Sequence, residues 1–167
     1  MFRDMTIHDF DLASFILKND TIDKIFAMGE KLFSKDVKNN NDIDTAMIIM
    51  KSKSGVLCHI NNSRHSSYGY DQRIELFGSK GMLISDNHTV NSVKKFNKSQ
   101  TNSKELVLNF FIERYENAFK NQLNSFINSV INKQKTLVTF EDGRNAIIIA
   151  NAAYKSMHTG KSIKIKY

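Results

Sequence analysis

The sequence predicts an α+β fold: one open, largely antiparallel sheet of about six strands or more, with helices packed on one face. The first observation is a series of short apolar runs between residues 21 and 96 that are joined by tight turns, and tight turns connect antiparallel neighbours. The second is that helical apolar spacing occurs before and after this series, which favours helices segregated from the strands. The third is the length of 167 residues, which suits one domain with a substantial core.

A helix is expected over residues 5–18. Apolar residues surround most of it, so it should be buried on more than one side. The polar residues Asp4, His8 and Asp11 follow one another at spacings of four and three, which places their side chains along one helix face. This stripe is a candidate proton-transfer site. The alternative is a core histidine with satisfied hydrogen bonds beside an aspartate that favours the helix N-terminus.

Six strands are expected after this helix. They cover residues 21–28, 44–51, 56–61, 72–77, 82–84 and 90–96. The turns at 53–55 and 78–81 should each close a hairpin. The second turn, Gly-Ser-Lys-Gly, resembles a phosphate-binding loop only superficially, because it joins strand to strand and offers no helix N-terminus to an anion.

Two helices and a short strand are expected to follow. A polar loop at 98–104 precedes helices at 110–133 and 140–158, and Gly160 should end the second helix. Residues 162–167 alternate as a strand. With the helices on one face, the other sheet face needs a cover, which is typical of an interface with another chain or domain.

Tyr68 and Tyr70 flank a glycine between two expected strands. At such a strand entry, the two phenols could hydrogen-bond a polyol. They could equally be loop aromatics that pack on the rim of the sheet. The sequence pattern alone leaves both interpretations open.

Composition excludes several classes of protein. A single cysteine, Cys58, provides no disulfide framework, and together with the lack of an apolar run long enough for a membrane span it favours the cytoplasm. The sequence has neither Gly-x-Gly-x-x-Gly nor Gly-x-x-x-x-Gly-Lys-Ser/Thr, so we expect no dinucleotide-binding element.

The formal net charge of +7 comes from scattered lysines, and nucleic-acid binding is the weakest of the alternatives. Metal-ligand spacing is absent from the remaining histidines: His59, His65, His88 and His158.

Four segments in the same order resemble the inositol 2-dehydrogenases of the glucose–fructose oxidoreductase-like (Gfo/Idh/MocA) family. They are residues 2–13 (FRDMTIHDFDLA), 68–81 (YGYDQRIELFGSKG), 111–115 (FIERY) and 142–156, which begins DGRNA. The resemblance covers essentially the whole chain. It implies the family's C-terminal domain, which is similar to that of dihydrodipicolinate reductase, with residues 1–167 as one substrate-binding and oligomerisation domain.

The resemblance also implies roles for single residues. His8 corresponds to the base that takes the proton of the substrate hydroxyl, and Asp4 orients or tunes it. Asp11 and Tyr68 would bind substrate hydroxyls. In the intact family the hydride passes to NAD or NADP on an N-terminal Rossmann domain, so we expect this chain to bind no cofactor by itself.

We therefore expect a truncated or split inositol 2-dehydrogenase-like oxidoreductase that is inactive alone. Its expected partners are further copies of itself through the open sheet face, a polyol or sugar, and a separately encoded Rossmann domain. The alternative is a non-enzymatic, homo-oligomeric assembly or binding module derived from the same fold.

Overall fold

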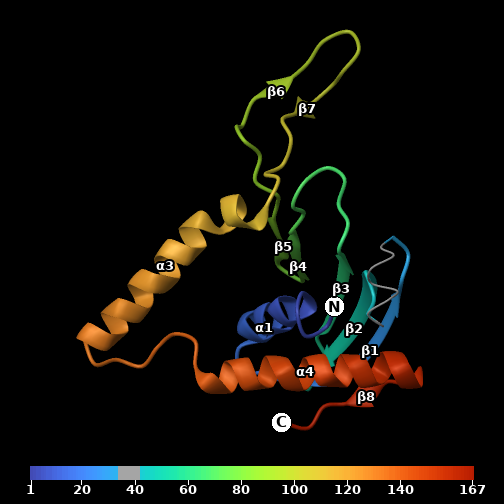
Figure 1. Cartoon of the computed structure of the whole chain (residues 1–167), viewed down its shortest axis with the longest axis vertical. Coiled ribbons are helices and arrows are strands. Elements are labelled where there is room, and N and C mark those ends of the chain that lie inside the picture. Colours follow the sequence, from blue (N-terminus) through green and yellow to red (C-terminus); the bar gives the residue numbers. More distant parts are fainter. Residues whose placement is uncertain (34–41) are drawn as a thin grey trace. The chain divides into compact units, whose positions relative to one another are not determined.

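The computed structural model describes residues 1–33 and 42–167 and divides the chain into two compact units. The first unit comprises residues 1–65 and 137–167, and the second comprises residues 66–136 (Figure 1). The predicted α+β class with antiparallel strands is confirmed. The expected single sheet of about six strands differs in detail, because the described strands form one four-stranded sheet and two two-stranded sheets.

The four-stranded sheet lies in the first unit and has the order β3-β2-β1-β8. All three of its strand pairs are antiparallel. The central strands β1 (Ile22–Glu30) and β2 (Thr45–Ser52) carry most of the pairing, while β8 (Ile163–Lys164) adds a short edge. Strand β3 (Leu57–Ser63) forms the expected hairpin with β2 through the turn at 53–55.

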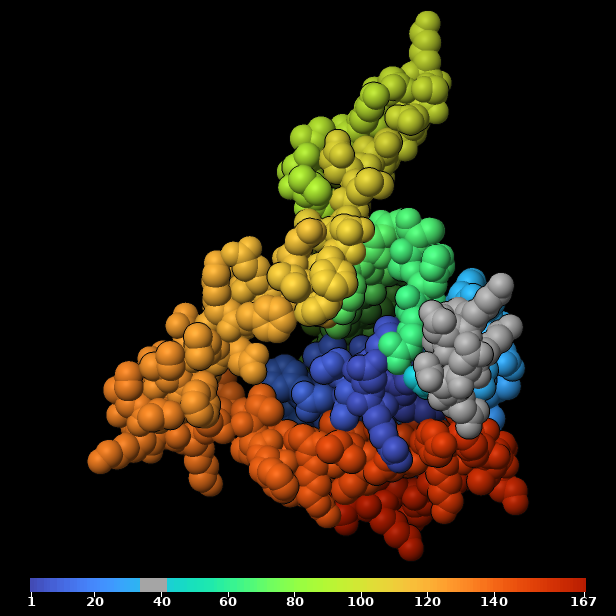
Figure 2. All heavy atoms as spheres, viewed as in Figure 1, coloured from blue at the N-terminus to red at the C-terminus, as the bar shows by residue number. Residues whose placement is uncertain are grey.

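Two helices cover one face of this sheet. Helix α4 (Phe140–Thr159) packs on β1 and β8, and helix α1 (Thr6–Leu17) packs on α4 and β3. In Figure 2 the blue surface of the N-terminal segment lies against the red surface of α4. The helix bounds agree with the sequence prediction within one or two residues.

The hydrophobic core lies between these helices and the sheet. Strand β2 shows the alternation that a half-covered sheet requires, because Ala46, Ile48 and Met50 are buried while the residues between them are exposed. Phe10 from α1 and Ile149 from α4 are fully buried in the same cluster. Both helices thus depend on the same apolar layer.

The opposite face of the sheet is uncovered within the described residues and carries an apolar patch. Its exposed members include Met28, Met47, Ile49 and Leu57, and Met47 is 63% exposed. Met28 and Met47 are cross-strand partners, so they extend across adjacent strands as one patch. A patch of this kind is typical of an interaction surface.

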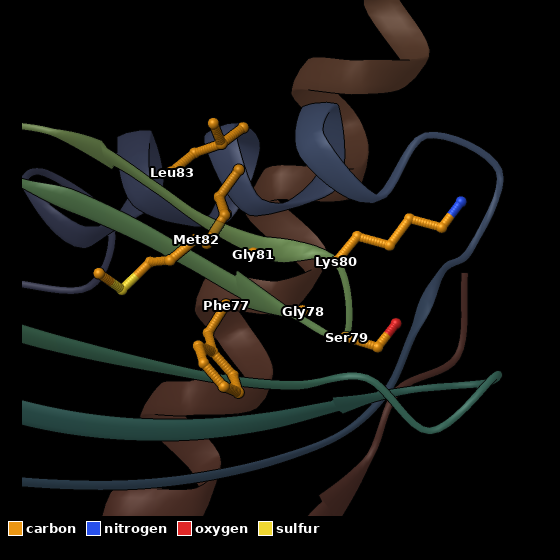
Figure 3. A pocket seen from close by; sticks show the side chains of 8 residues that line it. Phe77, Gly78, Ser79, Lys80, Gly81, Met82 and Leu83 are labelled. Atoms are coloured by element: carbon orange, nitrogen blue, oxygen red, sulfur yellow. The ribbon is translucent and has the colours of Figure 1, made fainter.

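The second unit contains helix α3 (Phe111–Ile131) and two hairpins. Strands β4 (Ile74–Gly78) and β5 (Gly81–Ser85) pair around a two-residue turn, which confirms the hairpin interpretation of the Gly-Ser-Lys-Gly motif. Phe77 and Leu83 point to opposite sides of this hairpin, and Lys80 points away from its tip (Figure 3). The hollow at the tip is lined only by the hairpin's own residues 76–83.

The second hairpin departs from the prediction. Residues 90–96 were expected to form a full strand, but only β6 (Lys94–Lys95) is paired. Its partner β7 (Ser103–Lys104) lies inside the segment expected to be a loop. The two lysines Lys94 and Lys104 face each other directly, and like charges in such a position disfavour a longer ladder.

Candidate functional site

A pocket between α1 and α4 brings His8 and Asp11 together in the first unit. Ile7 and these two residues contribute one wall from α1. The wall from α4 consists of Phe140, Gly143, Arg144, Ala146, Ile147 and Ile148. The pocket thus combines an imidazole, a carboxylate and a guanidinium with a mainly apolar lining, a composition that suits a small ligand with an apolar body and polar groups.

The start of α4 explains why this wall lies where it does. Thr139 caps the helix, because its hydroxyl accepts the Asp142 amide while the Asp142 carboxylate accepts the Thr139 amide at 2.7 Å. Gly143 follows directly in the first turn and lines the pocket. A Cβ added at Gly143 would meet no atom within 4 Å, so this position opens onto empty space.

Asp11 is the carboxylate that lines the same pocket as His8. Burial raises the pKa of Asp11, and the neighbouring Asp142 carboxylate raises it further, whereas the positive charge of His8 acts in the opposite direction. No side-chain hydrogen bond fixes the His8 ring among the residues that the structure describes. The ring is therefore available to a ligand in the pocket.

Asp4 lies just outside the helix on which it was expected. The chain forms a turn at residues 2–5, and α1 begins at Thr6. The Asp4 carboxylate forms a salt bridge with Arg64 at 2.8 Å, and Arg64 also reaches Asp42 at 3.3 Å. The expected stripe of three residues is thus reduced in this structure to His8 and Asp11, because the guanidinium holds Asp4.

Asp9 is a residue beside His8 whose contacts the sequence did not indicate. Its carboxylate accepts a hydrogen bond from the Asn62 amide of β3 at 2.9 Å. Burial raises the pKa of Asp9, and this effect outweighs the opposing contributions of Asn62 and His8. Asn62 lies 53 positions away, so no local pattern could have revealed the pair.

Replacing Asp9 by asparagine is expected to stabilise the chain at neutral pH. A carboxyl whose pKa is raised by folding costs stability once the pH exceeds that pKa, and the cost disappears when the pH falls below the unfolded value of about 3.8. An amide oxygen can still accept from Asn62. Urea unfolding should therefore show a gain for Asp9→Asn at pH 7 that shrinks toward pH 3. The exposed variant Glu75→Gln serves as the control, and a loss of stability at pH 7 would contradict the prediction.

Tyr68 lies in the second unit, where its side chain is 53% exposed. Its hydroxyl donates a hydrogen bond to Asp71. Tyr70 is half-buried and lies edge-to-face against Tyr115 of α3. The glycine between them has φ of +122°, and a Cβ there would approach Val107 to 2.5 Å, so this turn requires glycine. The two tyrosines thus have different surroundings, and Tyr68 is the accessible one.

Residues 1–33 and 42–167 contain neither a cluster of metal-ligating side chains nor a helix that could span a membrane. No three metal-ligating side chains come together there. None of the helices in that part of the chain has both the length and the apolar character that a membrane span needs.

The fold and the pocket define an α+β domain that carries a histidine and a carboxylate in one pocket. Residues 1–165 match the profile of the oxidoreductase family's C-terminal alpha/beta domain. The chain belongs to this oxidoreductase family and corresponds to its C-terminal domain.

Several relatives are inositol dehydrogenases. The myo-inositol 2-dehydrogenase of Thermotoga maritima is 39% identical over 99% of this chain, which spans 49% of that protein. The inositol 2-dehydrogenase of Rhizobium meliloti is 34% identical over 99% of the chain and 49% of its own length. The chain therefore spans about half the length of the curated relatives it matches.

Solved structures show the same relationship. A myo-inositol dehydrogenase from Corynebacterium glutamicum matches with a TM-score of 0.93 and 42% identity, over 99% of this chain and 49% of that one. A scyllo-inositol dehydrogenase from Lactobacillus casei, whose structure contains NAD(H) and scyllo-inositol, matches with a TM-score of 0.87 and 26% identity over 98% of this chain and 47% of that one.

Proposed function

We propose that this chain is the substrate-binding half of an inositol 2-dehydrogenase-like oxidoreductase and that it oxidises a polyol hydroxyl only together with a cofactor-binding domain. The observation that carries the proposal is the joint position of His8 and Asp11 in one pocket of a chain whose whole length matches the family's C-terminal domain. The relatives named above support a cyclic polyol as the substrate class.

In the proposed reaction His8 takes the proton of the hydroxyl that is oxidised. An ionised Asp11 can only accept hydrogen bonds, so it suits the recognition of further hydroxyl groups. Asp4 would act on His8 indirectly, through Arg64 and the turn that precedes α1. Tyr68 is proposed as a further hydroxyl-binding residue.

The nicotinamide cofactor implied by the family does not fit the residues of this chain. The sequence contains no glycine-rich dinucleotide fingerprint, and the Gly78–Gly81 turn closes a hairpin instead of leading into a helix. We therefore propose that a separate or additional domain supplies NAD(P). The cytoplasmic location expected from the sequence remains part of this proposal.

A binding and complementation experiment tests the proposed function. Titration of isotopically labelled chain with myo-inositol should shift the NMR signals of the residues around His8 and Gly143. The chain alone should reduce no NAD in the presence of inositol, whereas the chain combined with the cofactor-binding half of the Thermotoga maritima relative should. NAD reduction by the chain alone, or no shift and no complemented activity, would overturn the proposal.

The uncovered sheet face favours a second proposal, in which the domain assembles with copies of itself. The patch that includes Met28, Met47 and Ile49 extends over adjacent strands. It lies on the sheet face opposite the helices that carry the pocket, and apolar patches of this kind are typical of interaction surfaces. Association through this face is compatible with catalysis. If the chain associates but takes part in no catalysis, it is the non-enzymatic assembly module that the sequence offers as the alternative.

Sedimentation velocity at micromolar concentration should show a dimer or larger species. Ile49→Glu should shift the chain to a monomer, because it places a charge in the middle of the patch. The matched control is Phe15→Glu, which changes an exposed aromatic residue on α1. A monomeric parent chain, or equal effects of the two variants, would count against association through the sheet.

A further inference from the structure

Asp71 is the centre of a hydrogen-bonded cluster in the second unit. Its carboxylate accepts the Arg73 guanidinium through both oxygens, at 2.8 and 2.9 Å, and the Asn87 side-chain amide at 2.6 Å. The Tyr68 hydroxyl donates to the same carboxylate. The Asp71 side chain is only 17% exposed, so the carboxylate is nearly enclosed by these partners.

The protonation state of this cluster follows from its contacts. Burial alone would raise the pKa of Asp71, but hydrogen bonds from Arg73, Tyr68 and Asn87 outweigh burial and lower the pKa to about 2. The carboxylate is therefore ionised at neutral pH and can only accept. The phenolic proton of Tyr68 must then lie in the bond to Asp71, and this bond is the main reason that the pKa of Tyr68 is raised above 10.

A phenol whose single proton is committed in this way can interact with a ligand only through its oxygen lone pairs. Ser66 already interacts with this oxygen, as a hydrogen-bond partner that lowers the pKa of Tyr68. The half-exposed Tyr68 side chain leaves the oxygen accessible. The ligand group that fits this oxygen is a hydrogen-bond donor, such as the hydroxyl of a polyol, whereas a carbonyl or carboxylate oxygen would meet a second acceptor.

We propose that Asp71 is a positioning residue that fixes Tyr68 as a hydrogen-bond acceptor and thereby selects a ligand hydroxyl over a ligand acceptor at this position. The inference rests on the proposed function in one respect, namely that Tyr68 contacts the polyol. The geometry of the cluster itself is independent of that function.

Further contacts hold the cluster in place. Asn87 accepts the Gln72 amide at 2.8 Å, and the Gln72 side chain accepts the Tyr115 hydroxyl from α3. The segment that carries Tyr68 is thus tied to the turn after β5 and to α3, all within the second unit. A hydrogen-bond network of this kind holds the Tyr68 side chain in one orientation.

The first measurement is spectroscopic and needs no ligand. Ultraviolet titration of the full chain, compared with Tyr68→Phe, isolates the ionisation of the Tyr68 phenol. Its pKa should lie above 10 in the parent chain and fall in Asp71→Asn. The matched control is Asp86→Asn, because Asp86 also lies near Arg73 but bonds to the Asn87 backbone instead of Tyr68. That control should leave the Tyr68 pKa close to its parent value.

The second measurement uses myo-inositol and its monofluoro-deoxy analogues as probes, with affinity followed by NMR. Fluorine cannot donate a hydrogen bond, so one analogue should bind the parent chain about three- to tenfold more weakly than myo-inositol. Tyr68→Phe should bind that analogue and myo-inositol equally well. Asp71→Ala, which removes the acceptor that holds the Tyr68 proton, should lose most of the discrimination, and Asp86→Asn should keep it.

The outcomes separate the two proposals. If myo-inositol shifts no signal of the chain and complementation restores no activity, the proposed function fails. If it binds but no fluorinated analogue is discriminated through Tyr68, or if the Tyr68 pKa is unchanged in Asp71→Asn, this inference alone is overturned. Should either Asp71 variant fail to fold, as judged by circular dichroism, the comparison of the parent chain with Tyr68→Phe on the analogue series still decides the result.

Discussion

Replacing His8 by alanine is expected to lower the rate of inositol oxidation by about 10²–10⁴-fold in the chain complemented with a cofactor-binding domain. The expected cause is the loss of the base that removes the hydroxyl proton. Because His8 shares its pocket with Asp11 and a mainly apolar lining, the remaining contacts should still hold the polyol. The loss should therefore appear mainly in kcat, with a small change in KM.

The matched control for this variant is His88→Ala, which removes an exposed imidazole from the second unit. It should leave kcat unchanged. Steady-state kinetics with myo-inositol and NAD provide the measurement, and circular dichroism verifies folding. Comparable kcat values for His8→Ala and the parent chain would show that His8 is not the base, and would favour the assembly module.

Replacing Phe10 by alanine should lower the free energy of unfolding by about 3–5 kcal/mol. Phe10 is fully buried where α1 meets the shared apolar layer, so its removal leaves a cavity in addition to the lost burial. A loss of this size is a large fraction of the stability of an ordinary domain. Because α1 also carries His8 and Asp11, the pocket should lose its ligand affinity in the same variant.

The same helix supplies the control. Phe15 is 74% exposed, so Phe15→Ala should change the free energy of unfolding by no more than about 0.5 kcal/mol. Urea denaturation followed by circular dichroism measures both variants. Equal destabilisation by the two replacements would contradict the position assigned to α1 against the core.

Local patterns were sufficient for the first unit. Alternation in β2 and helical spacing in α1 and α4 reflect which side of each element is buried, and this side can be predicted from residues close together in the sequence. The pairing of strands into sheets is harder to predict from the sequence. Lys94 and Lys104 are ten positions apart, and their mutual repulsion, which limits the ladder, becomes visible only once the two segments are aligned.

The candidate site shows the same division. His8 and Asp11 share a helix face, so their spacing predicted that they lie together. Arg64 binds Asp4, and Asn62 binds Asp9, from a strand end more than 50 positions away, and the sequence gives no sign of either contact. Gly143 was part of a family resemblance, but its place in the pocket wall depends on how α4 packs on α1.

The open position at Gly143 makes the pocket accessible to site-directed chemistry. A cysteine introduced by Gly143→Cys would project into empty space and offer its thiol to a fluorescent or spin-labelled reagent. The native Cys58 would compete poorly, because burial raises the pKa of its thiol and lowers the thiolate fraction that reacts. The glycine that leaves room in the pocket wall thus also provides a single attachment point for a reporter of ligand entry.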